Sequence, residues 1–193
     1  MNFSDSSQPV FDNNSVPRRD ILHGQIAAMD KNLSGDQFDI AYKRVCELYE
    51  LRGRVYQEEI AAITEEIVQV ASPTWQLRSL KTTLGTNVLP TATIVLIDAN
   101  GEKITSQSTG YSSTDAICSA IKKATKIRVF LKDLWYSSIS CGANSLGQAI
   151  VTAEYHNQQV RAKACSVDML EAAAKAYLMA INIAIDRIIQ QLD

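Results

Sequence analysis

The strongest constraint on the fold is a pattern that occurs twice between residues 75 and 192, namely three short apolar strands followed by a helix. Thr93-Ile94-Val95 precedes the turn at Asn100-Gly101, and 56 positions later Ala149-Ile150-Val151 precedes His156-Asn157. A duplicated unit of this size builds a pseudo-symmetric domain with binding sites between the copies. We therefore predict an α+β fold of two strand-strand-strand-helix units, in which two three-stranded antiparallel sheets sandwich two helices.

Turn residues and the spacing of apolar residues give the boundaries of the duplicated part. The predicted strands cover residues 76–84, 91–98, 103–107, 129–140, 148–155 and 159–164. Helices are expected from Asp115 and from Asp168 to about Leu192. The last helix has an apolar stripe wider than the roughly 100° of a one-sided helix, so it needs cover on two sides. Its end, residues 185–189, is a candidate dimer contact.

Residues 20–72 are predicted to form a small helical subdomain. A short amphipathic helix ends at the turn of residues 32–35. A second helix is expected to start near Asp36, whose carboxylate suits a first turn, and to stop at Gly53. A third helix covers about residues 57–71, with isoleucines on one face and glutamates on the other.

Composition describes an ordinary globular protein and excludes some partners. The chain is 46% apolar and 21% charged with a net charge of −2, so we expect no nucleic-acid partner. It has no run of roughly 20 apolar residues that could span a bilayer, so we expect no membrane partner. Residues 1–19 are rich in Ser, Asn, Asp and Pro and are predicted to be a disordered arm. The helical subdomain and the duplicated domain, residues 73–193, follow.

The residue patterns of metal binding and catalysis are missing. The cysteines are Cys46, Cys118, Cys141 and Cys165. They lie too far apart for a zinc ribbon or a redox pair, and we expect reduced thiols in a cytoplasmic protein. Neither His23 nor His156 has a second metal ligand at helical or hairpin spacing. We therefore expect no metal, no cofactor and no catalysis by this chain on its own.

Asp115 and Asp168 are the candidate functional residues, because each lies at the predicted start of a helix. Either each carboxylate only caps its first turn, or the two helix starts lie together and hold the carboxylate of a small ligand. The small apolar residues around them form either plain core or a pocket for a branched aliphatic side chain. The candidate effector-binding residues are Leu131, Leu134, Ser138, Ala164, Cys165, Ser166, Val167, Asp168, Ser113 and Asp115.

Several runs of residues carry a family resemblance. They are Gly85 to Thr93, with Pro90-Thr91-Ala92-Thr93 at its end, Ser145-Leu146-Gly147, Ser166-Val167-Asp168, and Glu171 to Asn182, with the core Ala-Lys-Ala-Tyr-Leu. Together they resemble the C-terminal regulatory domain of 2-isopropylmalate synthase and its citramalate synthase relatives, over about residues 75–185. The helical part from His23-Gly24 to Ile63 is similar to the linker subdomain of that family.

The resemblance implies a dimeric regulatory domain that binds leucine or isoleucine as a feedback effector and transmits inhibition to a catalytic barrel. The barrel is not in this sequence. We therefore expect either an excised regulatory fragment or a free-standing regulatory protein, and the leader over residues 1–20 favours the second.

The sequence departs from the family pattern at the candidate site. Lys163-Ala164-Cys165 stands where the family usually has Gly-x-Gly, Leu134 replaces a usual tyrosine, and Gly110 to Asp115 differs from Gly-x-Gly-Pro-Val-Asp. With fewer glycines, these loops adopt backbone conformations with positive φ less readily. Two alternatives therefore stay open, a ligand-free dimerisation and assembly module, and a non-catalytic subunit that completes a synthase with a separate barrel. The second copy keeps more family residues, so we expect binding on the Asp168 side.

Overall fold

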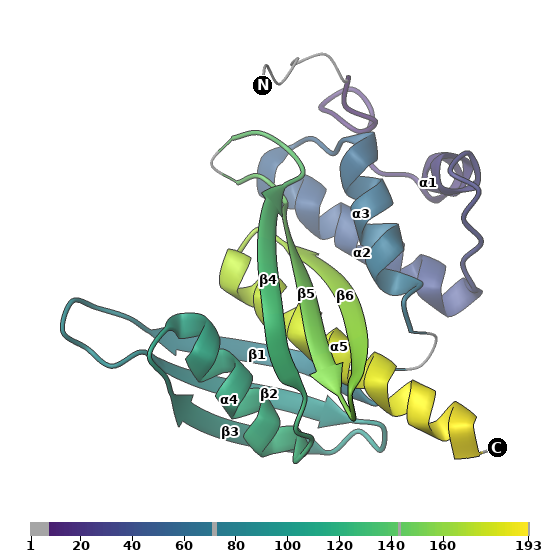
Figure 1. Ribbon diagram of the computed structural model, residues 1–193. Coiled ribbons are helices and arrows are strands. Elements are labelled where there is room, and N and C mark those ends of the chain that lie inside the picture. The colour runs from purple at the N-terminus through teal and green to yellow at the C-terminus, as the bar shows by residue number, and fades with distance from the viewer. Residues whose placement is uncertain (1–7, 71–72, 143, 193) are drawn as a thin grey trace. The chain divides into compact units, whose positions relative to one another are not determined.

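Figure 1 shows the computed structural model, which describes residues 8–70, 73–142 and 144–192. The chain divides into two compact units. The helical unit consists of Met1–Val68 together with Ser138–Leu146, and the duplicated unit consists of Gln69–Ser137 together with Gly147–Asp193. The segment Ser138–Leu146 was expected inside the duplicated domain, but it groups with the helices.

The helical unit contains α1 (Arg19–Ala27), α2 (Gly35–Arg52) and α3 (Gln57–Ile67). Helix α2 starts earlier than the expected Asp36, because Ser34 is its cap. Ser34 Oγ accepts a hydrogen bond from the Gln37 amide at 3.3 Å, and the Gln37 side chain accepts one from the Ser34 amide at 3.0 Å. The predicted stop at Gly53 is confirmed, since Gly53 adopts a left-handed conformation with φ of 71°.

The expected disordered arm over residues 1–19 is wrong for residues 10–15, and residues 1–7 lie outside the described part. Phe11 is fully buried and pairs with Val55, each amide donating to the other residue's carbonyl, at 3.2 and 2.9 Å. Asp12 and Ser15 form a second small bridge. One buried aromatic ring supplies enough apolar area to order a short polar segment, which average composition does not reveal.

The first half of the duplicated unit contains β1 (Trp75–Thr83), β2 (Thr91–Asp98), β3 (Lys103–Thr109) and α4 (Ser113–Thr125). The strands form an antiparallel sheet in the order β1-β2-β3, with a bulge between Leu77 and Ser79. Helix α4 packs on β2 and β3. The predicted strand-strand-strand-helix unit is confirmed.

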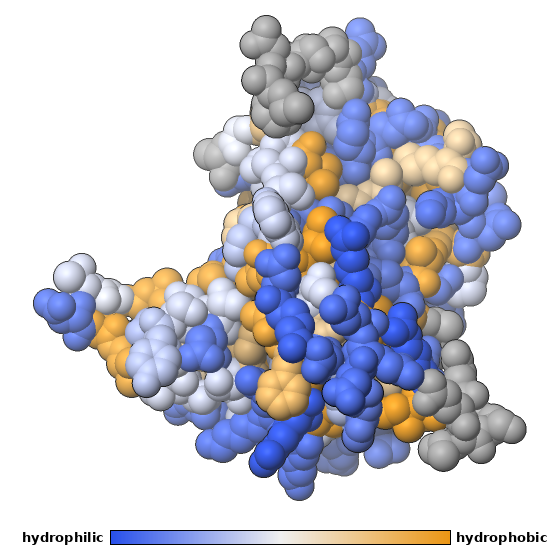
Figure 2. Space-filling view, in the orientation of Figure 1, coloured by the Kyte–Doolittle hydropathy of each residue, from blue (hydrophilic) through white to orange (hydrophobic). Residues whose placement is uncertain are grey.

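The second half repeats this arrangement with β4 (Phe130–Ser138), β5 (Gly147–Tyr155), β6 (Gln158–Ser166) and α5 (Met169–Leu192). The sheet order is β4-β5-β6. Helix α5 packs on β5 and β6 and also contacts β1, which gives it the cover on two sides that its wide apolar stripe requires (Figure 1). Figure 2 shows hydrophilic side chains over most of the outward face of the β4-β5-β6 sheet.

One apolar core joins the two halves. On β2 the buried side chains are Ala92, Ile94 and Leu96, and on β5 they are Ala149, Val151 and Ala153. On α5 the buried face is rich in alanine, with Ala172, Ala173, Ala174, Ala176, Ala180 and Ala184 beside Tyr177, Leu178 and Ile181. These small side chains let the helix approach both sheets closely.

Each sheet has one edge capped by an amide side chain. Asn182 of α5 accepts from the Trp75 amide at 2.9 Å and donates to the Trp75 carbonyl at 2.8 Å, at the free edge of β1. Gln69 does the same for Lys163 on β6, at 2.7 and 2.6 Å. Both amides imitate a neighbouring strand, which satisfies backbone groups that an edge otherwise leaves unpaired.

Candidate functional site

Asp168 is the cap of helix α5. Its Oδ1 atom accepts hydrogen bonds from the amides of Leu170 and Glu171, at 2.8 and 3.1 Å. Ser166 Oγ accepts from the Asp168 amide at 3.2 Å and donates to the Glu171 carboxylate at 3.1 Å. The amides that could have held a ligand carboxylate at this helix start are therefore occupied by the protein's own Asp168.

Asp115 has a different position in its helix. The cap of α4 is Ser112, whose Oγ accepts from the Asp115 amide at 3.1 Å, and the Asp115 carboxylate accepts from the Tyr111 amide at 3.0 Å. Ser112 therefore corresponds to Asp168, and Asp115 corresponds to Glu171, each pair being 56 positions apart. The expected pairing of Asp115 with Asp168 is wrong by one helical turn.

The expected correspondence between the strands of the two copies is also shifted, by one residue. In the hairpins, Ile94 lies opposite Ser106 and Val151 lies opposite Ala162. Ile94 is fully buried, whereas Ile150, its expected counterpart, lies on the other face of β5 and is only partly buried. The structural counterpart of Ile94 is Val151, because the first hairpin turn is longer, and a shift of one residue exchanges the two faces of a strand.

A cavity of about 250 Å³ lies beside Asp168, between β1 and the start of α5. Its lining residues are Leu77, Arg78, Ser79, Leu80, Thr82, Asp168, Leu170 and Glu171. The bulge at Arg78 sets Leu77 and Leu80 toward the same core side of β1. The cavity is therefore lined by leucines from both halves together with polar side chains, among them one guanidinium and two carboxylates.

The charged groups at this rim differ in their partners. Glu171 pairs with Lys175 at 2.6 Å and also accepts from Ser166. Within the described residues, Asp168 Oδ2 has no hydrogen-bond partner and Arg78 has no ion-pair partner. One cation and one carboxylate oxygen are thus available to a ligand with both charges.

Of the candidate residues named from the sequence, all of which the structure describes, only Asp168 lines this cavity. Leu131 and Leu134 are partly buried on β4, and Ala164, Cys165 and Ser166 are buried on β6. Val167 is 43% exposed, and Ser113 is the first residue of α4. Ser138 belongs to the helical unit, where its Oγ donates to the Ser140 carbonyl at 2.6 Å and lies 3.2 Å from Ser145 Oγ.

The cavity residues on β1 were not identified from the sequence. Residues 76–84 have the alternation of an ordinary strand, and nothing in that pattern marks Arg78 as a bulged residue. Contact between this strand and the start of α5 depends on how the two halves pack, which no short sequence window contains.

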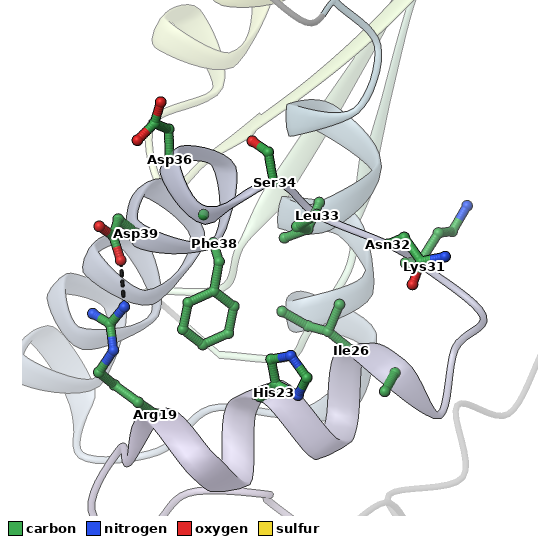
Figure 3. A pocket seen from close by; sticks show the side chains of 12 residues that line it. Arg19, His23, Ile26, Lys31, Asn32, Leu33, Ser34, Asp36, Phe38 and Asp39 are labelled. Atoms are coloured by element: carbon green, nitrogen blue, oxygen red, sulfur yellow. Dashed lines mark hydrogen bonds and ion pairs between the residues drawn. The ribbon is translucent and has the colours of Figure 1, made fainter.

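A second cavity, of about 540 Å³, lies within the helical unit between α1 and the start of α2 (Figure 3). Arg19 pairs with Asp39 there and lies over the Phe38 ring, 5.0 Å from its centroid. His23 packs against the same ring at 5.6 Å. Of the charged side chains that line this cavity, Arg19 and Asp39 are thus paired with each other, and Lys31 and Asp36 line it as well.

No group of three or more potential metal ligands occurs in the described part of the chain. Burial raises the pKa of the Cys118 thiol to about 12, an effect that Lys122 opposes and Asp115 reinforces, so this cysteine stays protonated. None of the helices in the described ranges is both long and apolar enough to cross a membrane.

Comparison with known proteins identifies a family and several relatives. Residues 54–185 match the family described as LeuA allosteric (dimerisation) domain. The 2-isopropylmalate synthase of Dictyoglomus turgidum is 33% identical over 152 residues, which cover 78% of this chain and 30% of that protein. The enzyme of the same name from Geobacillus sp. (strain WCH70) is 30% identical over 165 residues, covering 85% of this chain and 32% of its own length. The chain thus spans about a third of the length of the curated relatives that it matches.

Proposed function

Because the chain belongs to the LeuA allosteric (dimerisation) domain family, we propose that it is the regulatory module of a 2-isopropylmalate synthase-like enzyme. In this role it forms a homodimer and binds leucine or isoleucine as a feedback effector. The observation that carries the proposal is the cavity beside Asp168, where three leucine side chains lie together with an available cation and an available carboxylate oxygen.

The size and chemistry of this cavity suit a free aliphatic amino acid. Its volume of about 250 Å³ lies just below the roughly 300–1,000 Å³ of sites for drug-sized ligands. The Arg78 guanidinium would donate two hydrogen bonds to the ligand carboxylate, and Asp168 Oδ2 would accept one from the ligand ammonium group. Leu77, Leu80 and Leu170 would contact the branched side chain.

Isothermal titration of the full chain with leucine, isoleucine and valine tests the proposal. We expect heat with at least one of them, and a ligand at 100 times its dissociation constant adds about 2.7 kcal/mol to the free energy of unfolding. Neither heat nor a thermal shift at millimolar concentrations of all three would overturn it.

Two variants test the assigned roles. Asp168→Asn keeps an oxygen that caps α5 nearly as well, but it removes the charge that faces the ammonium group. Arg78→Gln removes the partner of the carboxylate. Each should weaken binding about tenfold to 100-fold, since a hydrogen bond to a charged group contributes about 1.5–3 kcal/mol. Arg161→Gln, an exposed change on β6 outside the cavity, is the matched control and should bind normally.

A ligand-free dimerisation module is the second candidate. It was suggested by Cys165 and Leu134, which differ from the family pattern. Cys165 is fully buried and Leu134 packs against the core. Neither residue lines the cavity beside Asp168. Analytical ultracentrifugation should then give a dimer whose dissociation constant does not change with any of the three amino acids. A monomer at all concentrations would contradict both candidates.

The partner that receives the signal is proposed to be a catalytic barrel, on the same or a separate chain. We expect no condensation of acetyl-CoA with a 2-oxo acid by this chain alone, and inhibition by the effector only when the barrel is present. All four cysteines are free thiols, which supports a reducing compartment such as the cytoplasm.

A further inference from the structure

One end of the duplicated unit has a group of exposed apolar side chains, here called the hairpin patch. Their exposed fractions are 51% for Leu84, 49% for Val88, 56% for Leu89 and 100% for Tyr111. Residues 84–90 form the loop between β1 and β2, and Tyr111 lies between β3 and α4. The Gly110 amide donates to the Pro90 carbonyl at 3.0 Å, so the two loops lie side by side. Figure 2 shows hydrophobic side chains along this hairpin, at the left of the view.

The backbone at Tyr111 is held in place by contacts within the unit. Its amide donates to the Asp115 carboxylate at 3.0 Å. A Cβ added at the preceding Gly110 would lie 2.3 Å from the Ala116 amide nitrogen, so this loop packs closely on the start of α4. An aromatic ring on a fixed backbone loses little conformational entropy when a partner covers it. Tyrosines of this kind are typical anchor residues of protein interfaces.

No charged residue occurs in the two runs of sequence that form the hairpin patch. Charged residues make up 21% of the chain, but residues 82–97 and 104–114 contain none. The centres of protein interfaces are depleted in charge and enriched in tyrosine. A two-fold axis places a patch against its own copy, so a charge near the axis would face the same charge. An uncharged patch avoids this repulsion, which favours a second copy of the chain as the partner.

Two other largely exposed aromatic residues of the duplicated unit lie on β4, among charged groups. Phe130 is 62% exposed and Trp135 is 66% exposed. Between them in sequence, Lys132 pairs with Glu154 at 3.0 Å, and the Asp133 carboxylate accepts a hydrogen bond from the Trp135 indole. A second copy that covered this strand would have to remove these charges from water, which costs free energy. The hairpin patch has no such cost.

We propose that the hairpin patch is the surface through which two copies of this chain associate. The inference rests on the proposed homodimer and adds the location of its contact. The match to the family described as an allosteric (dimerisation) domain covers residues 54–185, which include the whole patch. A standard interface takes about 800 Å² from each partner. A fully exposed tyrosine supplies about 200 Å² of it, so Tyr111 and the three aliphatic side chains form the apolar centre. The threonines and serines of the two loops form the polar rim.

Analytical ultracentrifugation of the full chain tests the proposal. Leu89→Glu and Tyr111→Glu each place a carboxylate in the centre of the contact. Loss of an anchor residue weakens binding about 30-fold, and a symmetric contact loses it twice, so the dimer dissociation constant should rise about 1,000-fold. The matched controls are Phe130→Glu on β4 and Ile189→Glu at the end of α5, because these side chains are about as exposed as Leu89. Both controls should leave the dissociation constant unchanged.

Hydrogen exchange of the unmodified chain gives a second measurement that does not depend on the folding of variants. The amides of residues 84–89 should exchange more slowly above the dimer dissociation constant than below it. The assigned surface is wrong if the unmodified chain dimerises but these amides show no such difference, or if Leu89→Glu and Tyr111→Glu dimerise as tightly as the parent. The proposed homodimer would stand in that case. A parent chain that is monomeric at every concentration would refute both.

Discussion

Replacing Asn182 by leucine tests whether a side-chain amide at a sheet edge stabilises the duplicated unit. Asn182 is 3% exposed and makes hydrogen bonds of 2.9 and 2.8 Å to the amide and carbonyl of Trp75. Leucine has a similar volume, so the change leaves no cavity but removes both partners. A hydrogen bond contributes about 0.5–1.5 kcal/mol net. Two such bonds give about 2 kcal/mol, because Trp75 is partly exposed and water can replace some of the loss.

For a chain of this size, about 2 kcal/mol corresponds to a fall in Tm of about 4–8 °C. Thermal unfolding followed by circular dichroism and calorimetry measures it. Gln76→Leu is the matched control, since Gln76 is the exposed neighbour of Trp75 on the outward face of β1. This control should stay within about 0.5 kcal/mol of the parent chain. If Asn182→Leu were as stable as the control, the edge hydrogen bonds would contribute nothing and the reasoning would be refuted.

Other predictions concern backbone contacts, caps and buried thiols. An added Cβ at Gly110 overlaps the Ala116 amide of α4, so Gly110→Ala should lower the free energy of unfolding by about 1–3 kcal/mol, whereas Gly24→Ala, with open space around it, should not lower it. Ser34→Ala removes the cap of α2 and should cost about 1 kcal/mol in urea unfolding. The pKa of Cys118 is raised from 9.0 to about 12, so its stabilising effect is complete below pH 9 and is lost as pH rises toward 12. Cys118→Ala should therefore flatten the fall in stability between pH 9 and 12 measured by urea titration, and an unchanged slope would contradict this assignment.

The secondary structure could be predicted because its signals are local. Apolar alternation gave β2 at its observed bounds, and the glycine at position 53 ended α2 through a left-handed conformation that few other residues adopt readily. Such features depend on one residue and its close neighbours. The duplication of the strand-strand-strand-helix pattern then limited the ways in which these elements could pack.

The equivalence of the two halves was predicted less well, because periodic patterns do not count residues in turns. The hairpin around Asn100-Gly101 is longer than the one at His156-Asn157, and this difference moves Val151 rather than Ile150 to the position of Ile94. Asp115 and Asp168 were treated as equivalent because both are aspartates near the start of a helix. Their hydrogen bonds show that Asp168 is a cap and Asp115 is the third residue of its helix.

The cavity beside Asp168 could not be predicted from the sequence for a different reason. Arg78 lies 90 positions before Asp168 in the sequence. The bulge at Arg78 cannot be recognised from the alternation of apolar and polar residues along β1. The role of Asn182 was hidden in the same way, since an amide in an apolar helix appears only as an interruption. Both features arise from packing between elements that are distant in the chain.

The alanine-rich face of α5 limits how this part of the protein can change. Alanine has no side-chain torsion to restrict, so ordering this face loses backbone entropy only. Replacing one of these alanines by glycine would lower the free energy of unfolding by about 1 kcal/mol. Replacing it by a larger residue, between two packed sheets, would lower it by about 1–3 kcal/mol. At the buried residues Ala172, Ala176 and Ala180, both smaller and larger replacements are consequently expected to destabilise the fold. We expect this helix to tolerate fewer replacements than the larger side chains of the sheets that it supports, where one aliphatic residue can stand in for another.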